Sequence, residues 1–276
     1  MNDKSKYQAF LDTLVPLERE TPYAKVLVYG DSGVGKTVLA ATLGKRILLV
    51  DAVDGWVSLR NHPDLLSSIT RVKYEGLSQL DTLVDMFMDG QLEFDTIVLD
   101  EASAIATFDL DTVLKARSAK DISKDPNVPT QPDFFANTER CRRTFTRLFK
   151  LPVNVVMVAH VRDDKDERTG IVTRRPQFTP KLRTTIEQSC HLVGYLVANE
   201  TKDGDETKYV RRLQTMPSKG ITAKSRIGGL PFIVEEPNLG VLLKDFTETV
   251  ENSTEIPLEP DAPTTEESIP SLFGEN

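Results

Sequence analysis

Apolar runs rich in β-branched residues alternate along this chain with stretches of helical periodicity. The runs predict strands at Lys25–Tyr29, Arg46–Asp51, Ile69–Tyr74, Asp95–Asp100, Val153–Ala159, Leu192–Asn199, Tyr209–Thr215 and Val241–Asp245. Strands that alternate with helices are typical of a mostly parallel sheet covered by helices on both faces. The pattern therefore predicts an α/β fold.

The clearest helical stretch extends from about Asp133 to Lys150, and Pro132 and Asp133 suit the start of a helix. Its apolar and cationic side chains fall on opposite faces at spacings of three and four. The apolar set is Phe134, Cys141, Phe145 and Leu148, and the cationic set is Arg140, Arg143, Arg147 and Lys150.

A glycine-rich loop directly follows the first predicted strand and precedes a helical stretch. It reads Gly30, Asp31, Ser32, Gly33, Val34, Gly35, Lys36 and Thr37, which matches the Walker A pattern in its strand–loop–helix context. Glycines let backbone N–H groups surround phosphates, and the following helix adds the positive end of its dipole. We therefore expect ATP here, with Lys36 at its β- and γ-phosphates and the Thr37 hydroxyl on Mg²⁺.

Another apolar strand ends in Asp100 and Glu101, as a Walker B strand does. We expect Asp100 to hold Mg²⁺ through water and Glu101 to orient or deprotonate the attacking water. Asp51 is an alternative base, because it ends the second strand, with Asp54 three residues on, and ligands in such sheets lie at the carboxyl ends of strands. Asp51 and Asp54 suit a helix cap or a solvated charge equally well.

His160 follows the predicted strand Val153–Ala159 and is a third polar strand end. A lone histidine is usually structural or solvent-facing, but this position also suits a sensor of the nucleotide's phosphates. His62 and His191 have no partners at ligand spacing, so we assign them no chemistry.

Charge divides the chain into a neutral body and an acidic tail. The 276 residues are 39% hydrophobic and 28% charged, an ordinary globular composition, and the formal net charge is −8. Residues 247–276 hold eight acids and no base, which leaves 34 acids against 34 bases in residues 1–246. This tail is rich in proline, serine and threonine, so we expect it to be disordered. It suits a solubilising tail or a docking peptide for a partner.

The chain has no apolar run long enough to cross a bilayer and no secretory h-region near Met1, so we expect a cytoplasmic protein without a membrane partner. Cys141 and Cys190 lie far apart, as reduced structural thiols would.

The order of these parts resembles the RecA/RadA recombinase core, in particular the short phage-encoded, core-only RecA-like ATPases of the nucleotide-binding or single-strand annealing type. The resemblance spans residues 25–245 and rests on the Walker A loop, the Walker B strand, the strand that ends in His160 before a long polar loop, and residues 220–230. It implies a RecA-like core over residues 25–246, with residues 1–24 as a packing or oligomerisation segment, a filament or ring of copies, and the host cytoplasm as location.

In such recombinases the polar residue after Walker B senses the γ-phosphate and orders a mobile DNA-binding loop. The resemblance places His160 in that role and residues 161–185 in the loop, which is net basic. Its candidate DNA-binding residues are Arg162, Arg168, Arg174, Arg175, Lys181 and Arg183. Phe178 is the one aromatic residue of this segment and offers a face for a single base. The alternative is an exposed hairpin of mixed charge.

Lys224 and Arg226 resemble the paired cations that recombinases insert into a neighbouring subunit's nucleotide site. The alternative is a pair of surface cations before a glycine turn. The chain departs from the family where recombinases have a catalytic glutamate after the second strand, because here Asp51 is followed by Ala52, Val53 and Asp54.

The sequence predicts an ATP-dependent, single-stranded DNA-binding ATPase of phage recombination or annealing. The tail would recruit a single-strand-binding protein or cover the basic loop, and the cationic helix face would be a second DNA track or a solvated surface. One rival is a nucleotide-switched interaction protein, such as a helicase loader, whose hydrolysis is indifferent to DNA. The other is a metabolic P-loop kinase, for which we find no acceptor motif.

Overall fold

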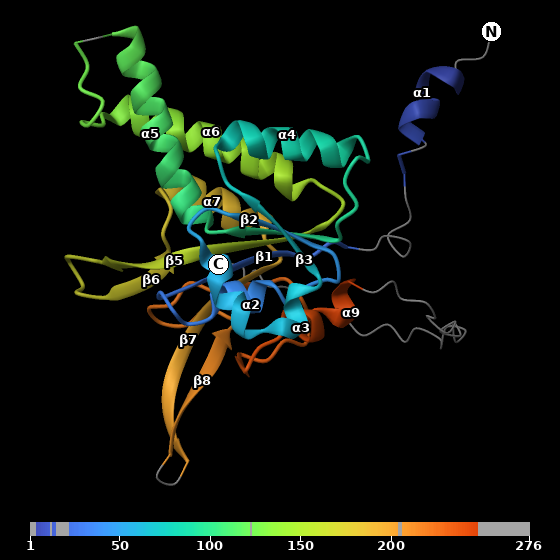
Figure 1. Ribbon diagram of the computed structural model, residues 1–276, viewed down its shortest axis with the longest axis vertical. Helices are drawn as coiled ribbons and strands as arrows, with labels where there is room; N and C mark the ends of the chain where they lie inside the picture. Colours follow the sequence, from blue (N-terminus) through green and yellow to red (C-terminus); the bar gives the residue numbers. More distant parts are fainter. Residues whose placement is uncertain (1–3, 12, 15–21, 122, 204–205, 248–276) are drawn as a thin grey trace, which may run out of the picture.

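The computed structural model describes residues 4–11, 13–14, 22–121, 123–203 and 206–247. Helices cover both faces of a ten-stranded sheet (Figure 1). The strands are β1 (Lys25–Gly30), β2 (Ile47–Asp51), β3 (Ile69–Lys73), β4 (Thr96–Asp100), β5 (Asn154–Lys165), β6 (Val172–Pro176), β7 (Leu192–Asp203), β8 (Glu206–Gln214), β9 (Lys224–Ser225) and β10 (Ile233–Glu235). The helices are α1 (Lys4–Leu11), α2 (Lys36–Ala40), η2 (Gly55–Asn61, a 3-10 helix), α3 (Pro63–Leu66), α4 (Leu77–Met88), α5 (Ala102–Lys120), α6 (Gln131–Phe149), α7 (Pro180–Ser189), α8 (Leu239–Leu242) and α9 (Lys244–Thr247).

The strands are ordered β10-β8-β7-β1-β5-β4-β2-β3, with β6 paired to β5 and β9 to β7. All pairs from β7 through β1, β5, β4 and β2 to β3 are parallel, whereas β8, β10, β6 and β9 join antiparallel. The α/β fold with a mostly parallel central sheet is therefore confirmed. Because β5 lies between β1 and β4, His160 of β5, which pairs with Gly30 of β1, lies between the Walker A loop and the Walker B acids.

Alternating side chains of the central strands feed two cores, one on each face of the sheet. In β1, Leu27 and Tyr29 pack with α4, α5, α6 and α7, while Val26 and Val28 pack with α2, η2 and α8. All four side chains are fully buried. A strand buried on both faces reads as a continuous apolar run, which explains the strong sequence signal here.

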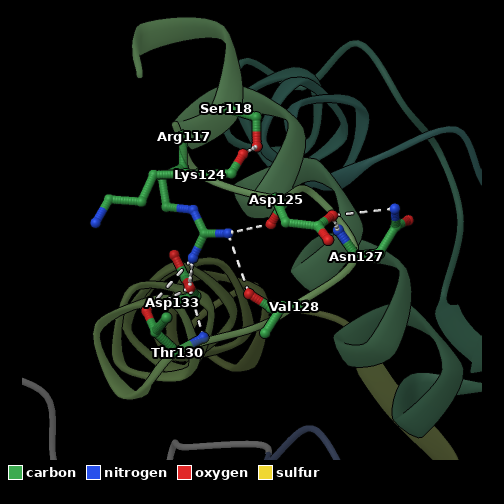
Figure 2. A network of polar contacts seen from close by, with 8 residues as sticks. All are labelled: Arg117, Ser118, Lys124, Asp125, Asn127, Val128, Thr130 and Asp133. Carbon is green, nitrogen blue, oxygen red and sulfur yellow. Dashed lines mark hydrogen bonds and ion pairs between the residues drawn. The ribbon is translucent and has the colours of Figure 1, made fainter. Parts of the chain in front are cut away.

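The predicted helix at 133–150 is confirmed as α6, which begins two residues earlier. Thr130 caps it: the Asp133 carboxylate accepts hydrogen bonds from the Thr130 backbone N–H and hydroxyl, at 2.7 and 2.6 Å. Arg117 of α5 contacts the same carboxylate and donates to the carbonyls of Asp125 and Val128 (Figure 2). One guanidinium thus holds the α5–α6 connection against the start of α6.

Two predictions of secondary structure are wrong. The expected strand Val241–Asp245 is instead helical, in α8 and α9, because Leu239 and Leu243 are both fully buried and have the four-residue spacing of a helix. The expected long loop 161–185 is instead the end of β5, the strand β6 and the helix α7, so the alternative of a mixed-charge hairpin describes its fold.

Two expected segments fall largely outside the described residues. Of the tail 247–276, the structure describes Thr247 alone. Of the N-terminal segment 1–24, it describes α1 and residues 13–14 and 22–24, so its packing or oligomerisation role stays a prediction.

Candidate functional site

The glycine-rich loop leaves β1 at Gly30 and enters α2 at Gly35, its N-cap. At Gly30 an added Cβ would lie 2.2 Å from the Leu196 carbonyl oxygen, so the close approach of β7 requires glycine. Gly35 has φ 93°, in the left-handed region that favours glycine. The sequence thus bends the chain directly from the sheet into a helix N-terminus, as a phosphate cradle requires.

Lys36 and Thr37 are the loop residues expected to contact the phosphates and the metal ion. The buried Lys36 ammonium donates to the Gly30 and Asp31 carbonyls, at 3.1 and 2.7 Å, and burial lowers its pKa. The Thr37 hydroxyl donates to Asp100 Oδ2 at 2.8 Å. Burial raises the pKa of Asp100 to about 6. A buried carboxylate beside a hydroxyl suits a hard cation, so the donors fit Mg²⁺ and the loop fits a phosphate chain.

A cavity of about 540 Å³ opens over this loop. It is lined by Ser32, Gly33, Gly35, Lys36, Thr37, Val38, Val53, Gly55, Ser58, Asn61, His62, Asp100, Glu101, His160 and Arg211. The structure therefore brings five of the eight predicted Walker A residues, both Walker B acids and His160 to one cavity.

Glu101 and His160 are bound to each other on the cavity wall. Glu101 Oε1 accepts the His160 backbone N–H at 2.8 Å, and Oε2 lies 2.7 Å from His160 Nε2. Ser103 donates its hydroxyl to Oε1 as well. Glu101 is 3% exposed, whereas the His160 side chain is 41% exposed. The histidine therefore lies between the buried acid and the open side of the site.

Asp51 is buried beside Asp100 in the sheet register but does not line the cavity. Its Oδ1 accepts the Gly55 N–H at 3.0 Å and its Oδ2 accepts Arg71 Nε at 2.6 Å. Both oxygens thus hold the β2–η2 turn and the edge strand β3. Of the two candidate bases, Glu101 alone lies at the cavity.

Most predicted DNA-binding residues lie on the hairpin that β5 and β6 form beyond the sheet (Figure 1). Asp164 lies 2.9 Å from Arg162, 4.0 Å from Arg175 and 3.3 Å from Arg183 of α7. Three arginines thus share this carboxylate, and Glu187 of α7 also attracts Arg175 and Arg183. Arg168, at the exposed tip, makes no ion pair within the described residues.

Two further residues of that set have other partners. Arg174 donates to the Tyr195 hydroxyl at 3.1 Å and lies 3.6 Å from Asp163. Lys181 of α7 lies 2.5 Å from Glu139 of α6. Phe178 does not offer a face for a base, because it is 5% exposed within the core.

Two of the four cations on the cationic face of α6 pair with acids of neighbouring helices. Arg140 pairs with the buried Asp109 of α5 at 2.8 Å, and Arg147 pairs with Asp81 and Asp85 of α4 at 2.7 and 2.5 Å. These two arginines hold helices together and therefore do not form a continuous free track for DNA.

The two candidate trans-acting cations differ. The Lys224 ammonium donates to the Glu187 and Cys190 carbonyls, at 2.5 and 2.9 Å, where α7 ends. Arg226 is exposed and makes no ion pair within the described ranges. Neither lines the nucleotide cavity of its own chain. Lys224 therefore serves a contact within its own chain, whereas Arg226 is exposed.

Comparison with known proteins places this geometry in a family. A family model described as an AAA domain matches residues 23–227. The chain belongs to this family. The solved structure of the flagellar accessory protein FlaH from Methanocaldococcus jannaschii covers 78% of this chain and 86% of that one, at 13% identity and a TM-score of 0.36. No curated protein matches the chain. AAA domains are P-loop proteins, so the family and the observed loop agree on nucleotide-dependent activity.

Several cavity residues of this AAA domain were missed in the sequence. Ser58 and Asn61 come from η2, whose signal is too weak to predict, and His62, which follows η2, was assigned no chemistry. Arg211 comes from β8, far along the chain from every motif. Only its place on a predicted strand gave any signal.

Among the described residues, no helix of this AAA domain is both long enough and apolar enough to span a bilayer.

Proposed function

We propose that this AAA domain is an ATP-dependent, single-stranded DNA-binding ATPase of the RecA-like class, acting in phage DNA recombination or annealing. One observation carries the proposal. β5 runs without a break from the nucleotide cavity, where His160 contacts Glu101, into the basic hairpin that bears Arg162. A change at the phosphates therefore has a direct mechanical route to the hairpin.

The cavity residues divide the work of hydrolysis among them. Lys36 binds the β- and γ-phosphate oxygens once it leaves its two loop carbonyls. Thr37 and Asp100 would hold Mg²⁺, which when bound would supply positive charge to neutralise the phosphates. Glu101, buried and next to Asp100, orients the attacking water and accepts its proton.

His160 acts as the sensor in this proposal. Its imidazole Nε2 is held by Glu101 at 2.7 Å and is partly exposed to the cavity. A γ-phosphate competes with the Glu101 carboxylate for this donor, so nucleotide binding moves His160. The part of β5 that follows His160 forms the hairpin.

A second contact ties the Walker A strand to the hairpin. The Tyr29 hydroxyl, at the end of β1, donates to the Thr222 carbonyl at 2.5 Å and lies 3.2 Å from the Arg174 carbonyl of β6. The Tyr29 ring packs against Tyr195, whose hydroxyl accepts from Arg174. Strand β1 is therefore connected to the base of the hairpin by hydrogen bonds.

Excess cations on the hairpin supply the affinity for nucleic acid. Arg162, Arg175 and Arg183 share Asp164, so phosphates replace part of a crowded ion-pair cluster rather than a matched pair. The proposal extends to a filament or ring of copies in which Arg226 reaches a neighbour's site, to a single-strand-binding protein as a partner of the tail, and to the host cytoplasm.

Binding of a fluorescent oligo-dT, measured by anisotropy with ATP and with ADP, tests the hairpin's role. We expect Arg162→Ala with Arg175→Ala to weaken ATP-dependent binding and to reduce the slope of log affinity against log salt by about 1.4. The matched control is Arg46→Ala. Arg46 is an exposed cation that pairs with Glu93 and directly precedes β2, at the opposite end of the parallel strands from the hairpin. Unchanged DNA affinity in the double variant would overturn the assignment.

A further inference from the structure

Arg211 of β8 lies directly over the phosphate loop, although no motif marks it. An ideal Cβ built on Gly35 would lie 2.7 Å from Arg211 Nε and 3.2 Å from its Cδ. The side chain therefore packs on the backbone of the loop at the N-cap of α2. Its guanidinium lines the same cavity as Lys36 and Thr37.

A weak ion pair holds the guanidinium in this position. Arg211 Nη1 lies 3.4 Å from Glu236 Oε2, with the two side chains 42% and 55% exposed. Backbone contacts fix the pair more firmly: Arg211 N donates to Glu236 Oε1 at 2.7 Å, and Glu236 N donates to the Arg211 carbonyl at 2.8 Å. The position of Arg211 is thus set by the backbone, while most of its guanidinium donors have no partner among the described residues and can bind a ligand.

The adjacent residue, Arg212, does not face the cavity. Arg212 follows Arg211, so its side chain is on the opposite face of β8, and it pairs with Glu235 at 2.7 Å. Arg212 does not line the cavity. The strand therefore presents two arginines, each paired with a glutamate at or just beyond β10, and one of them is at the nucleotide site.

We propose that Arg211 binds the phosphates of the nucleotide within its own chain. A planar guanidinium with several N–H donors matches phosphate oxygens, and the cavity's two acids, Asp100 and Glu101, leave a polyphosphate in need of cations besides Lys36. The contact also links the nucleotide to β8 and so to the β7–β8 hairpin, which projects from the sheet (Figure 1). This inference rests on nucleotide binding alone and is independent of the DNA proposal.

Calorimetric titration of the full chain with ATP and with AMP, in the presence of Mg²⁺, tests the role of Arg211. We expect Arg211→Ala to bind ATP about tenfold more weakly than the unmodified protein, with a much smaller loss for AMP. Arg212→Ala is the matched control and should bind both nucleotides as the unmodified protein does. If Arg211→Ala does not fold, Arg211→Gln, which replaces the charged guanidinium with a neutral amide and keeps more of the side-chain volume, gives the same comparison.

The outcomes separate this inference from the rest of the account. ATP affinity in Arg211→Ala equal to that of the unmodified protein, or equal losses for ATP and AMP, would overturn the phosphate contact. If Lys36→Ala also leaves ATP affinity unchanged, the loop is not the nucleotide site and the proposed function fails with the inference. If Lys36→Ala alone loses affinity, only the role of Arg211 is overturned.

Discussion

Arg140 of α6 pairs with Asp109 of α5. Removing only the arginine leaves the buried Asp109 carboxylate without its cationic partner. Arg140 Nε lies 3.2 and 3.0 Å from the two Asp109 oxygens, and Nη2 lies 2.8 Å from Oδ1. The Asp109 side chain is 1% exposed, whereas that of Arg140 is 47% exposed. In Arg140→Ala the carboxylate keeps one distant partner, the Asn137 amide at 3.3 Å.

Breaking a buried pair by removing one partner costs about 3–5 kcal/mol, and the half-exposed arginine favours the lower end because water can enter. We therefore expect Arg140→Ala to lower the free energy of unfolding by about 3 kcal/mol, or Tm by about 6–12 °C for a chain of this size. Urea unfolding followed by circular dichroism measures it.

Two variants make this test specific. Arg143→Ala removes an exposed cation of the same helix that makes no ion pair within the described residues, so its stability should change by less than about 0.5 kcal/mol. Asp109→Asn added to Arg140→Ala should recover stability, because the stranded charge is gone. Equal, small losses of unfolding free energy in Arg140→Ala and Arg143→Ala would refute the reasoning. Both arginines would then be solvated surface residues.

Two further predictions concern the site and the core. Glu101→Gln keeps the shape but not the base, so ATP hydrolysis should fall about 10²–10⁴-fold while ATP affinity by calorimetry changes little; hydrolysis at the original rate would assign the base elsewhere. Burial raises the pKa of both Cys141 and Cys190 from 9.0 to about 12, so a thiol reagent at pH 8 should react only after unfolding in urea. The folded chain keeps these protons where the unfolded chain loses them, so stability should fall as pH rises from about 9 to about 12. Rapid labelling of the native protein, or stability that is flat over that range, would show that the thiols are accessible.

The sequence predicted those parts of the site that local motifs encode. The Walker A loop needs glycine at Gly30 and Gly35 for backbone reasons, and the β1 and β4 strands are buried on both faces, so both left clear signals. The order of the strands left none, because it depends on contacts between distant segments. The contact between Glu101 and His160 follows from that order, since β5 lies beside β4.

Other expectations failed because side-chain partners are set by the tertiary fold. Phe178 reads as an exposed aromatic residue in a polar loop, but it packs in the core where α7 begins. Lys224 reads as a free cation, but the carbonyls at the end of α7 occupy it. Arg211 has no motif at all, and only the pairing of β8 with β7 carries it to the loop.

The rate of ATP hydrolysis with Mg²⁺, measured with and without poly-dT and beside Lys36→Ala, tests the central claim most directly. The account predicts that poly-dT stimulates hydrolysis strongly and that Lys36→Ala abolishes both the basal and the stimulated rate. Hydrolysis that is lost in Lys36→Ala but indifferent to poly-dT would contradict the claim and favour a nucleotide-switched interaction protein.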